Sequence, residues 1–75
     1  MREFAGIDIS KKTFDIYFEQ NGQGTHVCFN QNEQDYKRFI NLIGKERICI
    51  MEATGNYHVK LSRFLYENKL KVLVE

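Results

Sequence analysis

Apolar and polar residues alternate along the first thirty positions, which is typical of strands that bury one face. We predict strands over residues 3–9, 13–20 and 24–29. Asn21-Gly22 separates the last two and is a strong hairpin signal, because both residues tolerate positive φ. A two-residue turn there pairs Phe14 with Phe29, so that apolar residues face apolar residues.

The turn over residues 10–13 sets the register of the first two predicted strands. An even-length turn pairs Ile9 with Phe14 and places Asp8 opposite Asp15, on the other face of the sheet. Carboxylates that face each other repel, and a cation between them would remove the penalty.

The hydrophobic period changes to that of a helix after residue 30. Asn30-Gln-Asn-Glu33 fits a capping box with Asn30 as the N-cap, and Gly44 is a natural stop. The predicted helix extends to Ile43. One apolar stripe follows its core face: Tyr36, Phe39, Ile40 and Ile43.

Residues 48–51 are all apolar, which predicts a central parallel strand that is buried on both faces. A second helix is expected from about Tyr57 to Glu67, with Thr54 or Asn56 as its N-cap and a strand over residues 70–74 after it. Its predicted inward residues are Tyr57, Leu61, Phe64 and Leu65. The expected order is therefore β-β-β-α-β-α-β, an α/β fold whose mixed sheet has three antiparallel strands and then two parallel strands joined by right-handed crossovers.

Composition narrows the class of protein only slightly. The 75 residues make one small domain or a piece of one, and 43% apolar residues are enough for a packed core. A net charge of +1 gives no bulk electrostatic argument for nucleic acid and does not exclude it. No apolar run is long enough for a membrane span, and the first residues lack a signal-peptide pattern. We predict that Cys28 and Cys49 are reduced core thiols of a cytosolic protein.

Two acids stand out chemically. Asp8 interrupts a buried strand, and Glu52 directly follows the apolar run 48–51. If both strands deliver a carboxylate to the same edge of the sheet, the pair outlines a divalent-metal site, and Mg²⁺ prefers a few carboxylates plus water. The purely structural alternatives are a solvated strand end for Asp8 and an acid near a helix N-terminus for Glu52.

Four further residues are weaker candidates for the site's surroundings or for a DNA contact: Asp15, Ser10, Lys11 and Thr54. Lys11 fits a solvated turn, and lysine is also a common phosphate contact. His26 and His58 have no partner at metal spacing, so we expect both to be surface or edge residues.

Two motifs at this separation resemble a known family. Gly6-Ile-Asp-Ile-Ser-Lys11, Asp15 in the next strand, and Met51-Glu-Ala-Thr-Gly-Asn-Tyr57 look like the N-terminal part of DEDD-type insertion-sequence transposases, the family of the Piv-like DNA invertases. That domain resembles the RuvC Holliday-junction resolvase and has the ribonuclease H-like fold. The resemblance covers nearly the whole chain, and it implies that residues 1–75 are the N-terminal part of such a catalytic domain.

The resemblance implies roles and partners as well. Asp8 matches the first acid of the family's DEDD set and Glu52 matches the second, while the remaining two acids and the C-terminal transposase domain would lie beyond Glu75. A complete site is expected to hold Mg²⁺ or Mn²⁺. The implied full-length protein is a homo-oligomeric enzyme of the prokaryotic cytoplasm and nucleoid. It acts on the DNA ends and target of a mobile element, in some relatives with a guide RNA. The 75-residue piece alone is expected to be inactive.

Three alternatives remain open. An actin-like kinase or ATPase needs a glycine-rich phosphate turn, whereas Ser10-Lys-Lys12 has no glycine. A non-catalytic binding or oligomerisation module of this fold could use residues 70–74 as an open edge. A junction-resolving nuclease would share the metal chemistry and differ in its DNA substrate.

Overall fold

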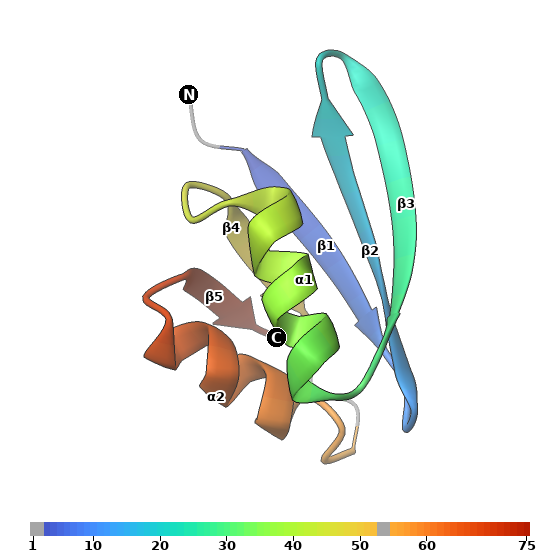
Figure 1. Cartoon of the computed structure of the whole chain (residues 1–75), viewed down its shortest axis with the longest axis vertical. Helices are drawn as coiled ribbons and strands as arrows, with labels where there is room; N and C mark the ends of the chain where they lie inside the picture. The colour runs from blue at the N-terminus through green and yellow to red at the C-terminus, as the bar shows by residue number, and fades with distance from the viewer. Residues whose placement is uncertain (1–2, 53–54) are drawn as a thin grey trace.

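The computed structural model describes residues 3–52 and 55–75. It is a mixed α/β fold with a five-stranded mixed sheet and two helices. The elements are β1 Phe4–Ile9, β2 Thr13–Gln20, β3 Gln23–Asn30, α1 Glu33–Ile43, β4 Ile48–Met51, α2 Val59–Glu67 and β5 Lys71–Val74. The sheet order is β3-β2-β1-β4-β5, and both helices lie against one face of the sheet (Figure 1). The predicted element order, and the division into antiparallel and then parallel pairs, are confirmed.

The predicted registers are also confirmed. Phe14 pairs with Phe29 across β2 and β3, and Asp8 lies opposite Asp15 across β1 and β2. At the hairpin Asn21 has φ 55° and Gly22 has φ 80°, the two positive values that the tightest two-residue turns require. The turn and the apolar pattern therefore select the same pairing.

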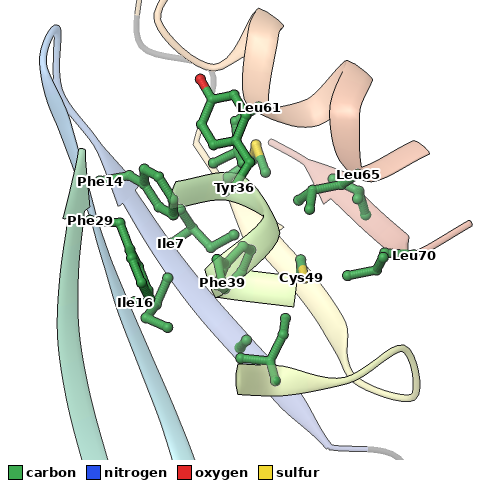
Figure 2. Close-up of a cluster of buried hydrophobic side chains, with 14 of the residues drawn as sticks. Ile7, Phe14, Ile16, Phe29, Tyr36, Phe39, Cys49, Leu61, Leu65 and Leu70 are labelled. Carbon is green, nitrogen blue, oxygen red and sulfur yellow. The ribbon is translucent and has the colours of Figure 1, made fainter. Parts of the chain in front are cut away.

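The core fills the space between the sheet and the helices. Phe14 lies at its centre, with ring centroids 5.4 Å from Phe29, 5.7 Å from Tyr36 and 5.5 Å from Phe39. These aromatic side chains come from β2, β3 and α1, as Figure 2 shows. The largest fully buried side chains are Phe14, Phe39, Ile16, Met51, Leu61, Leu65 and Cys49. Since all five strands contribute buried residues to this cluster, one core holds the described fold together.

The second face of the sheet is open, and this corrects two predictions. Ile48 and Ile50 on this face of β4 are only half-buried, so β4 is not buried on both faces. Cys28 is exposed, whereas Cys49 is buried as expected. The reason is alternation: Cys28 points away from the helices because Phe29 points toward them. An all-apolar run does not reveal which of its faces is covered.

The helix ends differ from the predicted ones. Asn32, not Asn30, is the N-cap of α1, and its Oδ1 accepts a 2.7 Å hydrogen bond from the Asp35 N–H. Asn30 still belongs to β3, and its N–H donates to Asp35 Oδ2 at 2.8 Å. The local caps are thus shifted by two residues, because the strand is longer than its apolar pattern. Gly44 ends the helix with φ 73°, as predicted.

The second helix begins two residues later than predicted. Its N-cap is His58, which makes no side-chain capping hydrogen bond. Of the two predicted N-caps, Asn56 lies in the turn before the helix, and Thr54 is outside the described residues. Tyr57 is 45% exposed and does not enter the core, because it precedes the first helical turn.

Arg47 joins three elements just before β4 begins. Its Nη1 donates to the carbonyl of Ile43 at 2.9 Å, and its Nη2 donates to the carbonyl of Glu19 at 3.0 Å. The same Nη2 lies 3.0 Å from Glu3 Oε2, and the guanidinium carbon is 4.8 Å from the centre of the Phe18 ring. Arg47 therefore holds together the end of α1, the end of β2 and the residue before β1.

Neither of the two helices resolved between residues 3–52 and 55–75 combines the length and the apolar character needed to cross a bilayer.

Candidate metal site

Asp8 and Glu52 lie side by side at the carboxyl edge of the sheet. β1 and β4 are adjacent and parallel, and Ile7 pairs with Met51. Asp8 and Glu52 each follow one member of this pair. Ile7 and Met51 are buried under the helices, whereas Asp8 and Glu52 are exposed, because successive side chains alternate between faces. The two carboxylates thus lie on the same open face, at the ends of neighbouring strands.

A shallow open hollow of about 370 Å³ contains both acids. Gly6 lines it, between Tyr17 of β2 and Ile50 of β4 in the register of the sheet. A Cβ added to Gly6 would have room, since its nearest neighbour would be the Tyr17 carbonyl at 3.9 Å. The missing side chain therefore leaves space on the open face beside Asp8. The hollow is lined by Gly6, Ile7, Asp8, Ile9, Tyr17, Ile50, Met51, Glu52 and Glu75.

Glu75 is a third carboxylate in this hollow that the sequence analysis missed. Its N–H donates to the Met51 carbonyl at 2.9 Å, which continues the parallel pairing of Val74 with Met51 by one residue. Glu75 therefore follows β5 as Glu52 follows β4. The signal was present in the sequence, because each apolar parallel strand is followed by an acid in the same register.

Asp15 faces Asp8 across β1 and β2, and its carboxylate contacts a side chain of β3 on the other side. Its Oδ1 lies 2.8 Å from His26 Nε2, and the His26 ring stacks on Tyr17 with centroids 4.5 Å apart. His26 is exposed, as expected for a surface residue, yet it has a carboxylate partner that the sequence analysis did not foresee. The pairing of Tyr17 with His26 across the hairpin would have placed His26 beside Asp15. His26 therefore supplies Asp15 with a polar partner on β3.

The other weak candidates lie around this edge. Ser10 closes the β1–β2 turn, because its Oγ donates to the Thr13 carbonyl at 3.0 Å and also lies 2.9 Å from Thr13 Oγ1. Lys11 is exposed in the same turn and lines a separate hollow on the helix side, with Tyr57. Thr54 lies outside the described residues. The structure therefore gives Ser10 a turn-forming role and directs Lys11 away from the acids.

The carboxylate oxygens of this hollow are the type of ligand that a hard divalent cation prefers, but there are too few of them to complete a site. Carboxylate oxygens are the ligands of Mg²⁺ and Mn²⁺, and within the described part of the chain no thiol or imidazole lines the hollow to favour zinc. Over residues 3–52 and 55–75, no group of three or more His, Cys, Asp or Glu side chains is placed to hold a metal ion. Asp8 and Glu52 would therefore supply two ligands, and water or further protein groups would supply the rest.

The chain matches no protein-family model, and no curated protein matches it with significant similarity.

Proposed function

We propose that this chain is the N-terminal part of a ribonuclease H-like catalytic domain from a DNA transposase or site-specific recombinase. The observation that carries the proposal is the position of Asp8 and Glu52 at the carboxyl ends of two neighbouring parallel strands. Such strand ends are where open α/β sheets place their sites. The sheet order, with three antiparallel strands followed by two parallel ones, supports the same fold.

The chemistry proposed for the complete site is phosphodiester cleavage and rejoining. Bound Mg²⁺ or Mn²⁺ would stabilise the charge that develops on the attacking and leaving oxygens. Asp8 and Glu52 would hold the cation from two strands that cannot move independently, because they share a ladder of hydrogen bonds. Gly6 keeps the neighbouring surface low enough for a phosphate to approach.

The proposed partners follow from this chemistry. They are the DNA ends of a mobile element and its target, a guide RNA in the manner of some relatives, and further copies of the full-length protein. The proposed setting is the prokaryotic cytoplasm and its nucleoid. Two further acids and a second domain would come from sequence after Glu75.

Paramagnetic broadening by Mn²⁺ in amide NMR spectra of the 75-residue chain tests the cation site directly. We expect the first signals to broaden at residues 6–9, 51–52 and 75, and we expect Asp8→Asn or Glu52→Gln to abolish the effect. Glu46→Gln is the matched control, since Glu46 is an exposed acid before β4, at the opposite end of the strand from Glu52. Broadening that begins at scattered acids instead would refute the site.

A longer protein that contains the remaining acids allows the second test. Either substitution, Asp8→Asn or Glu52→Gln, should abolish strand cleavage while the fold is retained. Recombination that persists in either variant would contradict the assigned ligands. Four-way junctions cleaved in preference to element ends would indicate a junction-resolving nuclease, which shares the metal chemistry.

One observation favours a non-catalytic binding or oligomerisation module as the second candidate. The open face of the sheet exposes Phe4 by 54%, Tyr17 by 51% and Leu73 by 53%, and β5 is an edge strand. A large exposed apolar face often marks a contact surface. Sedimentation of the chain over a range of concentrations tests this candidate, and a monomer at all concentrations would exclude self-association.

A further inference from the structure

A groove lies between the first turn of α1 and one side of α2, on the helix side of the sheet. It consists of two adjoining hollows of about 360 and 260 Å³ that share Gln31, Tyr36, Val59 and Lys60. The first extends along α2 beside the first turn of α1, and the second reaches the β1–β2 turn and the turn before α2. The remaining lining residues are Lys11, Asn32, Glu33, Asn56, Tyr57, Arg63, Phe64 and Glu67.

The charges in this groove favour an anion. Lys11, Lys60 and Arg63 are exposed, and among the described residues none of the three lies within 4.0 Å of a carboxylate oxygen. Among the residues that the structure describes, the smaller hollow is lined by Lys11 and Lys60 and by no acid. Glu33 and Glu67 line the larger one, and Glu33 lies 3.8 Å from Lys37. Positive charge is therefore unopposed at the end of the groove nearest the sheet edge.

The floor of the groove is held together by one side chain. Gln31 Nε2 donates to the Ser10 carbonyl at 3.1 Å and to the Tyr57 carbonyl at 3.0 Å, while Gln31 Oε1 accepts a hydrogen bond from Tyr36 Oη. This side chain fixes the turn that carries Lys11 against the turn that carries Tyr57. The distance between the two turns is therefore set before any ligand binds, which lowers the cost of ordering a site.

Tyr57 gives the groove an exposed aromatic ring. The ring packs over Gly55, since a Cβ built on that glycine would lie 3.6 Å from Tyr57 Cε2. Tyr57 remains 45% exposed. An exposed ring beside cations is the combination on which single-stranded nucleic acids bind, with bases stacked on the ring and phosphates on the cations.

The groove also lies just over the edge of the sheet from the two acids. Lys11 is in the turn that directly follows β1 and Asp8, and residues 55–58 form the turn between Glu52 and α2. A strand whose phosphodiester reached the acidic hollow would cross this edge and continue into the groove. The acids and the cations would then contact neighbouring phosphates of one strand.

We propose that this groove binds the backbone of a single-stranded nucleic acid, with Lys11, Lys60 and Arg63 on phosphates and Tyr57 stacked on a base. The path of the bound strand from the acidic hollow into the groove rests on the proposed function. Binding in the groove itself requires no metal ion, so the two proposals can fail separately.

Fluorescence anisotropy with a labelled 20-nucleotide single strand, measured in EDTA over a range of salt concentrations, tests the groove. We expect the chain to bind and Lys60→Gln/Arg63→Gln to lower the slope of log K against log salt by about 1.4, since each single-strand phosphate contact contributes about 0.7. The matched control is Lys45→Gln/Lys71→Gln, which removes the same charge from two exposed lysines, one before β4 and one at the first position of β5, at the opposite edge of the sheet.

Further variants separate stacking from charge and the groove from the metal site. Tyr57→Leu should weaken binding of the single strand more than binding of the matching duplex, because paired bases are not free to stack on the ring. Asp8→Asn/Glu52→Gln should not weaken groove binding in EDTA, because two carboxylates without a cation only repel phosphate, and this expectation holds even if the cation site proves wrong. Equal losses in the groove and control variants, no binding by the parent chain, or tighter binding of a polyglutamate peptide would each overturn the proposal.

Discussion

The Asp8→Asn variant should be more stable than the parent chain without a divalent cation and less stable than the parent chain when the cation is present. Without the cation, Asp8 faces Asp15 across one ladder and lies beside Glu52 across the other. All three are acids on one face, and among the described residues no ion pair compensates Asp8, so its charge contributes repulsion. The variant should therefore be more stable than the parent chain in EDTA.

The expected size follows from the strand spacing. Cβ atoms of cross-strand neighbours are about 5 Å apart, which puts the charges at roughly 6 Å and each repulsion at about 0.7 kcal/mol in water. Ionic strength of 0.1 M reduces this to about 0.4 kcal/mol. His26 already contacts Asp15 and weakens its repulsion of Asp8. The repulsion of Asp8 by Asp15 and Glu52 together is therefore about 0.5 to 1 kcal/mol. That corresponds to a rise in Tm of roughly 2–8 °C for a domain of this size.

Cation binding should reverse the order of stability of the parent chain and the Asp8→Asn variant. At ten times its Kd, a cation that binds only the folded chain adds about 1.4 kcal/mol. The parent chain should gain this amount and overtake the Asp8→Asn variant, which should gain almost nothing. Urea melts in EDTA and in MnCl₂ at constant ionic strength measure both effects, with Glu46→Gln as the control. A variant that is less stable in EDTA, or that gains as much from Mn²⁺ as the parent, would refute the reasoning.

The fold supports three further predictions. Phe39→Ala should lower the free energy of unfolding by about 3–5 kcal/mol, because the side chain is 0% exposed in the aromatic core. Thermal melts should then show little or no folded chain, and a loss below about 1 kcal/mol would contradict this. Gly44→Ala should cost about 1–3 kcal/mol in urea melts, since φ 73° and ψ −174° suit only glycine, whereas Gly24→Ala should be close to neutral. Burial raises the pKa of the Cys49 thiol to about 11, so its contribution to the unfolding free energy is present below pH 9 and is lost between pH 9 and 11, by about 2–3 kcal/mol. Cys49→Ala should remove that part of the alkaline loss, and an unchanged pH profile would show that the thiol is not the source.

Local chemistry predicted much of the fold. Asn21-Gly22 fixed one register by itself, and the opposition of Asp8 to Asp15 followed from the length of a single turn. Such features depend only on residues that are close together in the sequence, so they can be predicted from it. The start of α1 was wrong by two residues because Asn30 pairs with Thr13, a contact between residues far apart in the chain.

The candidate site was only partly predictable for the same reason. Asp8 and Glu52 were recognisable as acids that interrupt or follow apolar strands. Glu75 and the contact between Asp15 and His26 depend on how three pairs of strands align, and on which face each side chain occupies. The exposure of Cys28 likewise depends on which side the helices cover, which no local pattern states.

The contacts of Arg47 have a consequence for the far end of β4. A slip of β4 by two residues would keep the same side chains on the core face, so burial alone does not prevent it. It would move Glu52 past Asp8 by roughly 6.6 Å, at 3.3 Å per residue. Arg47 opposes such a slip, because its bonds to Ile43, Glu19 and Glu3 anchor the residue before β4. Arg47 therefore contributes to the alignment of the two acids from the opposite end of the strand.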